Sequence, residues 1–299
     1  MTFRREFLTT PDGDELVLDH LDGSSESRVH VVLMHGLEGS SYSVYIQGVL
    51  AALVRHGHSA TAINFRSCAR DPQNIRRMLP NRRPRFYHSG ETTDFDFVLH
   101  TLAARMPNHK FAAFGASLGG NVLLKWLGEH PDQKLVTAAA TLSVPFDLGL
   151  GSRLLETTAA GRFYVSRFLA TLRKKVTRPD VAPLLDVPRV MRARTFWEYD
   201  DVATAPLHGF SGAADYYERS SSIHYVGRIT TPTLAINAAD DPFVPAEILP
   251  LLRDTASSAV SIRITPAGGH VGFIGGVAPW RCEYWGEETV VRWLVGNRN

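Results

Sequence analysis

The chain has 299 residues, enough for one large domain or two small ones, and 44% of them are hydrophobic while 21% are charged. This composition is that of an ordinary globular protein and excludes a disordered or fibrous one. With 32 basic and 30 acidic residues the formal net charge is only +2, so no global positive field points to a nucleic-acid partner.

The two cysteines and the N-terminal residues indicate the cellular compartment of the protein. Cys68 and Cys282 lie far apart and match no metal-ligand spacing, so we expect neither a disulfide framework nor a metal site. Asp12 and Asp14 precede any apolar run of signal-peptide length, and no run approaches the about 18 apolar residues of a membrane span. We therefore expect a cytoplasmic protein.

Strand and helix patterns alternate along the chain. Runs rich in β-branched residues predict strands at 29–34, 60–65, 110–114, 135–144, 233–238 and 260–264. Apolar residues three and four apart predict helices at 42–55, 93–105, 118–129, 246–252 and 287–294. This order predicts an α/β fold with a mostly parallel central sheet flanked by helices. Residues 15–21 are expected to add an antiparallel edge strand.

Residues 145–231 interrupt the alternation. They hold helical patterns, prolines and many aromatic residues between two predicted strands. We interpret them as a helical cap inserted before the penultimate strand, over the carboxyl ends of the strands, where open α/β sheets bind ligands. Because no internal repeat or linker is found, we favour a single domain over residues 1–299.

A candidate nucleophile lies between a predicted strand and a predicted helix. Residues 115–119 read Gly-Ala-Ser-Leu-Gly, the G-x-S-x-G pattern of a strained turn that projects Ser117 above the sheet. At roughly 0.1 chance matches in a chain of this length, a coincidence is disfavoured. The Leu118 N–H at the helix start lacks an intrahelical acceptor and can donate to a developing oxyanion.

A serine nucleophile needs a base, and the base needs a third group that orients it. Of the 12 histidines, His270 follows the last predicted strand in a glycine-rich loop, as the chain order serine, acid, histidine requires. We predict His270 as the base. The alternative is a histidine that merely lies in a surface loop.

Two aspartates compete for the acid after the penultimate predicted strand. Adjacent extended residues point to opposite sides, so only one of Asp240 and Asp241 can face the histidine. Pro242 restricts Asp241 to extended conformations. We favour Asp241, with Asp240 as a capping or solvated neighbour. The alternative is that both belong only to an Asp-Pro turn.

The second oxyanion donor is expected in the loop that follows the strand at 29–34. This loop reads His-Gly-Leu-Glu-Gly over 35–39, and its glycines allow the backbone to approach a substrate closely. We assign the donor to the Leu37 N–H. His35 is expected to order the loop by hydrogen bonding rather than to transfer protons.

Seven motifs in chain order together resemble the AB-hydrolase-4 family of the α/β-hydrolase superfamily: HGLEGSS at 35–41, NFRSC at 64–68, YHSGETTD at 87–94, GASLGGNVLLKWL at 115–127, SVPFD at 143–147, NAADDPF at 237–243 and GHVGF at 269–273. That family includes bacterial predicted hydrolases, plant embryogenesis-associated proteins, yeast medium-chain ethyl ester synthases and mammalian abhydrolase-domain phospholipases. The likeness spans nearly the whole chain.

The resemblance implies an α/β-hydrolase fold, a catalytic triad on Ser117, Asp241 and His270, and activity on medium-chain or lipid acyl esters. The sequence departs from the family at Ser67, where a glycine is usual, and this change is expected to alter a loop that flanks the pocket. The membrane-anchoring N-terminal segment of the eukaryotic relatives is not found, so membrane residence is not implied.

The cap sequence gives a clue to the substrate, because ligand sites are mostly apolar with a few placed polar groups. Most of its apolar residues should form cap core, and a minority should line an acyl pocket. The candidates are Phe146, Leu148, Leu150, Leu154, Leu155, Phe163, Tyr164, Phe168, Leu169, Leu172, Phe196, Trp197 and Phe210.

Two stretches are rich in arginine. Residues 66–85 hold seven arginines and one acid, and residues 151–199 hold ten basic and four acidic residues. Such runs are usually solvated surfaces. The alternative is peripheral contact with an anionic partner, either phospholipid headgroups or the phosphates of an acyl-CoA.

We predict a carboxylic-ester hydrolase that works without a cofactor, through an acyl-enzyme, on a small-molecule acyl ester. One alternative keeps the acyl-enzyme and makes the protein an acyltransferase or a thioesterase. Another is a hydrolase fold used as a binding module without turnover, which is disfavoured because no member of the predicted triad is missing.

Overall fold

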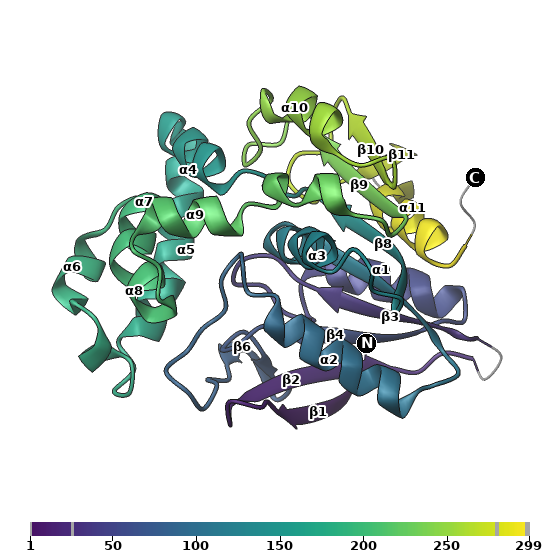
Figure 1. The fold of residues 1–299 in the computed structure, drawn as a ribbon, viewed down its shortest axis with the longest axis horizontal. Coiled ribbons are helices and arrows are strands. Elements are labelled where there is room, and N and C mark those ends of the chain that lie inside the picture. Colours follow the sequence, from purple (N-terminus) through teal and green to yellow (C-terminus); the bar gives the residue numbers. More distant parts are fainter. Residues whose placement is uncertain (1, 25–26, 279–280, 297–299) are drawn as a thin grey trace.

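The computed structural model describes residues 2–24, 27–278 and 281–296, and its centre is an eight-stranded sheet (Figure 1). Strands β1 and β2 run antiparallel to each other, β2 runs antiparallel to β4, and the remaining neighbours are parallel. In spatial order the strands are β1 (Arg4–Thr9), β2 (Glu15–Leu21), β4 (Ser59–Asn64), β3 (Val29–Met34), β7 (Lys110–Ala116), β8 (Val136–Leu142), β9 (Thr233–Ala238) and β10 (Val260–Thr265).

The six predicted central strands are all present, with ends that differ from the prediction by at most two residues. The predicted segment 15–21 forms β2 and is antiparallel, but its position at the sheet edge was wrong, because β1 lies outside it. In β1 only Leu8 is buried, and Phe7 is exposed, so its sequence lacks a clear apolar face that would have predicted it.

Helices cover both faces of the sheet. Helices α1 (Val44–Arg55) and α11 (Trp285–Leu294) bury their apolar sides against one face. Helices α2 (Thr93–Arg105), α3 (Leu118–Glu129) and α10 (Ile248–Thr255) pack on the other. The central strands are buried on both sides, which explains their continuous apolar runs.

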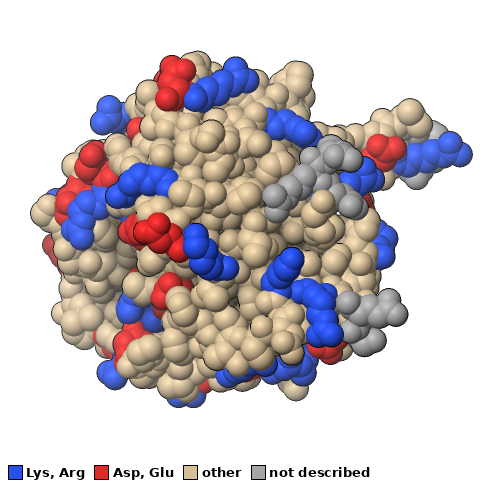
Figure 2. All heavy atoms as spheres, turned by 45° about the vertical axis from the view of Figure 1, so that its right-hand side comes forward, with Lys and Arg blue, Asp and Glu red and all other residues tan. Residues whose placement is uncertain are grey.

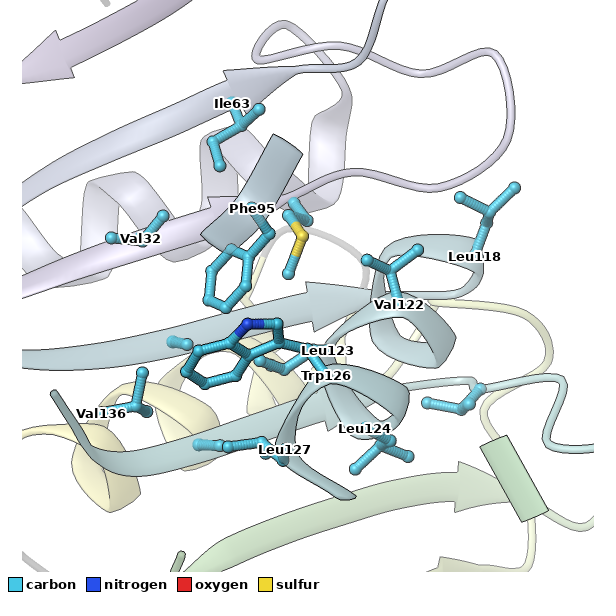
Figure 3. Close-up of a cluster of buried hydrophobic side chains, with 14 of the residues drawn as sticks. Val32, Ile63, Phe95, Leu118, Val122, Leu123, Leu124, Trp126, Leu127 and Val136 are labelled. Carbon is cyan, nitrogen blue, oxygen red and sulfur yellow. The ribbon is translucent and has the colours of Figure 1, made fainter. Parts of the chain in front are cut away.

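The core beneath the candidate site is built around an aromatic pair (Figure 3). Phe95 of α2 meets the edge of Trp126 of α3, with ring centroids 5.0 Å apart and an interplanar angle of 85°. The Trp126 indole N–H donates to Asp96 Oδ1 at 2.9 Å. These contacts fix α3, whose first turn follows Ser117, against the sheet.

The insertion between β8 and β9 is helical and lies beyond one end of the sheet (Figure 1). It has its own apolar cluster, in which Leu155, Val165, Leu169 and Val190 are buried. Its elements are α4 (Leu148–Thr157), α5 (Ala159–Val176), η1 (Ala182–Leu184), α6 (Val187–Arg192), α7 (Phe196–Tyr199), the π-turn η2 (Asp200–Thr204), α8 (Ala205–His208), α9 (Ala213–Ser220), η3 (Ser222–His224) and η4 (Val226–Arg228).

Two small antiparallel hairpins lie outside the main sheet, and the sequence did not predict either. They are β5 (Arg70–Asp71) with β6 (Asn74–Met78), and β11 (Ile274–Ala278) with β12 (Arg281–Tyr284). Strand β6 is exposed along nearly its whole length, so it has no buried face to set an apolar alternation.

On the face in Figure 2, basic and acidic side chains are interspersed, in keeping with the small net charge.

We expect Phe95→Ala to lower the free energy of unfolding by about 3–5 kcal/mol, because it removes a buried ring and leaves a cavity against Trp126. Urea unfolding of the variant measures the loss. The matched control is Phe7→Ala, since the Phe7 side chain is 54% exposed. Equal losses in the two variants would contradict the packing described here.

Candidate active site

Ser117 lies in the sharp turn between β7 and α3. Its backbone has φ +52° and ψ −120°, a conformation that is strained for a residue with a side chain. The turn requires small neighbours, because a Cβ at Gly115 would lie 2.4 Å from the Gly119 carbonyl oxygen and one at Gly119 would lie 2.6 Å from the His35 carbonyl oxygen. The G-x-S-x-G pattern is therefore a steric requirement of this turn.

The three residues that the sequence predicted as a triad are hydrogen-bonded in series. Ser117 Oγ lies 2.9 Å from His270 Nε2. His270 Nδ1 lies 3.0 Å from both carboxylate oxygens of Asp241. The Asp241 side chain is fully buried, and its Oδ1 also accepts from the Phe243 N–H at 2.9 Å. This geometry places Nδ1 toward the carboxylate and Nε2 toward the hydroxyl, the arrangement in which Nδ1–H donates to Asp241 and Nε2 can accept the Ser117 proton.

The structure separates the two candidate aspartates. Asp240 is exposed and points to the other side, where its Oδ1 accepts from the Gly269 N–H at 2.8 Å. It therefore ties down the loop that carries His270 without touching the imidazole. Asp241 alone of the two contacts His270.

Ser143 holds the same histidine loop from the β8 side, a role that the sequence did not predict. Its hydroxyl accepts from the Val271 N–H at 2.9 Å. Both residues have left-handed backbones, with φ of +53° for Ser143 and +56° for Val271. The Phe243 ring lies on the imidazole of His270, with centroids 4.3 Å apart. The motif SVPFD at 143–147 could have indicated this role, because it begins with Ser143 and directly follows β8.

The two predicted oxyanion donors both line the cavity that contains Ser117. Leu37 lies in the loop after β3, and Leu118 is the first residue of α3. Within the part of the chain that the structure describes, neither backbone N–H donates to a protein acceptor. Both are available to a substrate oxygen.

His35 orders the loop after β3, as predicted. Its Nδ1 donates to the Gly36 carbonyl oxygen at 2.7 Å, and its Nε2 accepts from the Phe65 N–H at 3.1 Å. Complete burial lowers the pKa of His35 to about 3. The ring is therefore neutral and joins the ends of β3 and β4.

An ion pair links this loop to the cap. Lys175, near the end of α5, donates from Nζ to Glu38 Oε1, and both side chains are buried. The Tyr87 hydroxyl donates to the same carboxylate oxygen at 2.8 Å and accepts from the Glu38 N–H at 2.7 Å. Glu38 has φ +55°, so these contacts hold a strained residue next to Leu37.

Ser67, the predicted departure from the family pattern, also sits in a left-handed conformation, with φ +61°. Glycine would adopt it without strain. The serine hydroxyl accepts from Arg178 Nη1 at 3.1 Å and from the Asn81 N–H at 3.2 Å. The substitution thus keeps the turn and adds a contact from the loop to the cap.

A cavity of about 300 Å³ opens at Ser117, between the sheet and the insertion. Helices α4, α5 and α7 supply much of its apolar lining. Its apolar lining residues include Leu37, Leu118, Leu148, Leu155, Phe168, Leu172, Phe196 and Phe243. Of the aromatic and leucine candidates named from the sequence, Leu148, Leu155, Phe168, Leu172 and Phe196 line it. Leu169 instead lies in the cap core, and Phe163 and Tyr164 are exposed.

Residues 29–277 match the model of the α/β hydrolase fold family. The chain belongs to this family. Its predicted fold is confirmed by the match and by the solved structure of the esterase Pf2001 from Pyrococcus furiosus, which has 17% sequence identity and a TM-score of 0.58 over 90% of this chain and 85% of that one.

Curated relatives match over nearly the whole chain. A protein of Escherichia coli (strain K12) named "Putative esterase YheT" is 35% identical over 96% of this chain and 83% of its own length. Mouse (Mus musculus) phospholipase ABHD3 is 30% identical over 94% of this chain and 69% of its own. The monoacylglycerol lipase of Saccharomyces cerevisiae is 28% identical over 90% of this chain and 59% of its own length.

These relatives are of the bacterial and mammalian kinds that the AB-hydrolase-4 resemblance named, so that resemblance is confirmed. Their esterase and lipase names bear out the predicted enzyme class, a carboxylic-ester hydrolase. No helix in the described part of the chain is both long enough and apolar enough to cross a bilayer.

We expect Lys175→Met to destabilise the protein by about 3–5 kcal/mol, because it leaves the Glu38 carboxylate buried without its cation. Glu38→Gln should also be costly, for the converse reason. The double variant should recover most of the stability, since no uncompensated charge remains. Urea unfolding of the four proteins gives the coupling energy, and strictly additive losses would contradict a direct ion pair.

Proposed function

We propose that this protein hydrolyses carboxylic esters through an acyl-enzyme, with Ser117 as nucleophile, His270 as general base and Asp241 as the group that orients the base. The observation that carries the proposal is the continuous chain of hydrogen bonds from Ser117 Oγ through His270 to Asp241 at the mouth of an apolar cavity. An activated serine needs this connection, because its hydroxyl is otherwise a weak nucleophile.

In the first half of the reaction Ser117 Oγ attacks the ester carbonyl carbon while its proton passes to His270 Nε2. Asp241 stabilises the imidazolium through the Nδ1–H bond. The N–H groups of Leu37 and Leu118 donate to the oxygen that becomes negative in the tetrahedral intermediate. His270 then returns the proton to the leaving alcohol oxygen, and the acyl group remains on Ser117.

In the second half, water loses a proton to His270 and attacks the acyl-enzyme; His270 then returns that proton to Ser117 Oγ as the acyl–oxygen bond breaks, which releases the carboxylic acid and restores the enzyme. An alcohol or thiol in place of that water would give acyl transfer instead of hydrolysis. The apolar lining of the cavity supports medium-chain or lipid acyl esters as substrates. The lipase and phospholipase names of the relatives support the same substrate class.

Two neighbouring aspartates allow a matched test of these roles on an octanoyl ester. Ser117→Ala should abolish turnover, and Asp241→Asn should lower kcat by about 10⁴ because the imidazole loses its correct tautomer. Asp240→Asn removes the same charge one residue away and should lower kcat by less than roughly tenfold, since Asp240 accepts from the Gly269 N–H and does not contact His270 among the described residues. A larger loss in the Asp240 variant would overturn the assignment.

We further propose peripheral contact with anionic membranes through the outer face of α5. Phe163 and Tyr164 are exposed there, between the exposed residues Arg162 and Arg167. Exposed aromatic side chains with basic neighbours are found on helices that lie in the membrane interface.

The first arginine-rich stretch supports this proposal less. Arg66, Arg82 and Arg85 pair with carboxylates of the chain itself: Arg66 with Asp12, Asp14 and Asp94, Arg82 with Glu15, and Arg85 with Asp12 and Glu91. Most of the charge in residues 66–85 is thereby neutralised within the fold, so we assign the membrane contact to α5.

Cosedimentation with phosphatidylserine-containing vesicles at low salt tests the contact. Wild type should bind these vesicles more tightly than neutral ones. The affinity of Arg162→Glu/Arg167→Glu for them should be at least roughly tenfold lower, because each basic residue near an anionic surface contributes about 1 kcal/mol to binding. Arg4→Glu/Arg28→Glu, at the opposite ends of the strands, is the control with the same change in charge. Equal loss in both double variants, or no binding by wild type, would reject α5 as the contact.

A further inference from the structure

One carboxylate inside the cap has no role in the proposed reaction. Asp200 begins the π-turn η2 and lines the same cavity as Ser117. Its Oδ1 accepts from the Thr204 hydroxyl at 2.5 Å, and its Oδ2 accepts from the Tyr217 hydroxyl at 2.7 Å. These two bonds hold the carboxylate, and the residue as a whole is half-buried among those that line the cavity.

Burying the ionised Asp200 carboxylate at this position lowers the stability of the folded protein. Within the described residues no lysine, arginine or histidine forms an ion pair with it. Burial raises its pKa from the ordinary value of 3.8 to about 6. The carboxylate is therefore ionised near neutral pH, and its ionisation opposes folding.

The hydrogen-bonding capacity of this group is not exhausted. An ionised carboxylate accepts about four hydrogen bonds, of which Thr204 and Tyr217 supply two. Much of the surrounding cavity wall is apolar, with Leu155, Phe168 and Leu172 among its members. Proteins keep such costly polar groups mainly at functional sites, and π-turns are often found there.

We propose that Asp200 binds a hydroxyl group of the substrate, so that the preferred esters carry a free hydroxyl on either their alcohol or their acyl part. The proposal rests on the ester-hydrolase function and names the substrate class of the same cavity. A substrate hydroxyl would donate to the free acceptor sites of the carboxylate, while its alkyl part packs on the apolar wall.

The same geometry disfavours other polar groups at this position. A carboxylate accepts hydrogen bonds and repels anions, so the phosphate of a phospholipid or an acyl-CoA should not bind next to Asp200. The carboxylate charge would attract a quaternary ammonium group, but that group has no N–H or O–H and leaves the free acceptor sites without a hydrogen bond. A hydroxyl group fills those sites.

The test uses four esters whose acyl chains have the same length: ethyl octanoate, 1-monooctanoylglycerol (the glyceryl ester), ethyl 8-hydroxyoctanoate and octanoylcholine (the choline ester). The measured quantity is the ratio of kcat/KM for each polar ester to that for ethyl octanoate. Wild type should favour the glyceryl or the hydroxyacyl ester, and the favoured one shows which part of the substrate carries the hydroxyl. In Asp200→Leu that ratio should fall by roughly tenfold or more, as for a lost hydrogen bond to a charged group.

Asp201→Asn is the matched control. Asp201 adjoins Asp200 in the same turn, but it is not among the residues that line the cavity, and it lies 3.8 Å from Arg189. This variant should leave the substrate ratio within about twofold of wild type. Equal changes in the ratio for the Asp200 and Asp201 variants would overturn the proposal, as would a ratio that Asp200→Leu does not change, or a preference for the choline ester.

Asp200→Asn supplies a second readout that separates recognition from structure. Because the folded-state pKa lies above the ordinary value, the cost of ionisation is complete above about pH 6 and absent below about pH 4. Asp200→Asn should therefore raise the melting temperature at pH 8 but not at pH 4, while its substrate ratio falls. A higher melting temperature with an unchanged ratio would show that Asp200 does not recognise substrate. If the wild-type protein hydrolysed none of the four esters, the ester-hydrolase function itself would be rejected.

Discussion

The hydrogen bond between Ser117 Oγ and His270 Nε2 joins residues 153 positions apart in the sequence, and much of the fold serves to make that contact. Ser117 follows β7, Asp241 follows β9 and His270 follows β10, so all three leave the carboxyl ends of parallel strands in one sheet. Parallel pairing places those ends along one edge, where short loops can bring the side chains together.

Backbone strain is concentrated around this contact. Ser117, Ser143 and Val271 all have left-handed backbones, and so does Glu38, which follows Leu37 in the loop after β3. Each is held by packing or by a specific hydrogen bond, such as the one from the Val271 N–H to the Ser143 hydroxyl. The well-packed core beneath α3, including Phe95 and Trp126, provides the rigid base that can sustain this strain.

Local patterns were sufficient to predict the central sheet, its flanking helices and the serine turn, because each depends on residues close in sequence. Of the two candidate aspartates only Asp241 contacts His270, but both lie in the turn after β9 (Thr233–Ala238), so the alternation of side chains along a strand does not explain the difference. The ion pair of Glu38 with Lys175 and the carboxylate of Asp200 in the cavity were not predictable, because they depend on how the cap packs. Strand β1 and the two hairpins escaped prediction because their exposed residues carry little apolar periodicity.

The central claim is that Ser117 is an activated nucleophile, and its most direct test is to react the protein with a fluorophosphonate and locate the adduct by peptide mass spectrometry. The account predicts one modified peptide, with the phosphonyl group on Ser117, and much slower labelling after His270→Ala. An adduct on another serine, or an unlabelled protein in the presence of lipid and detergent, would contradict it.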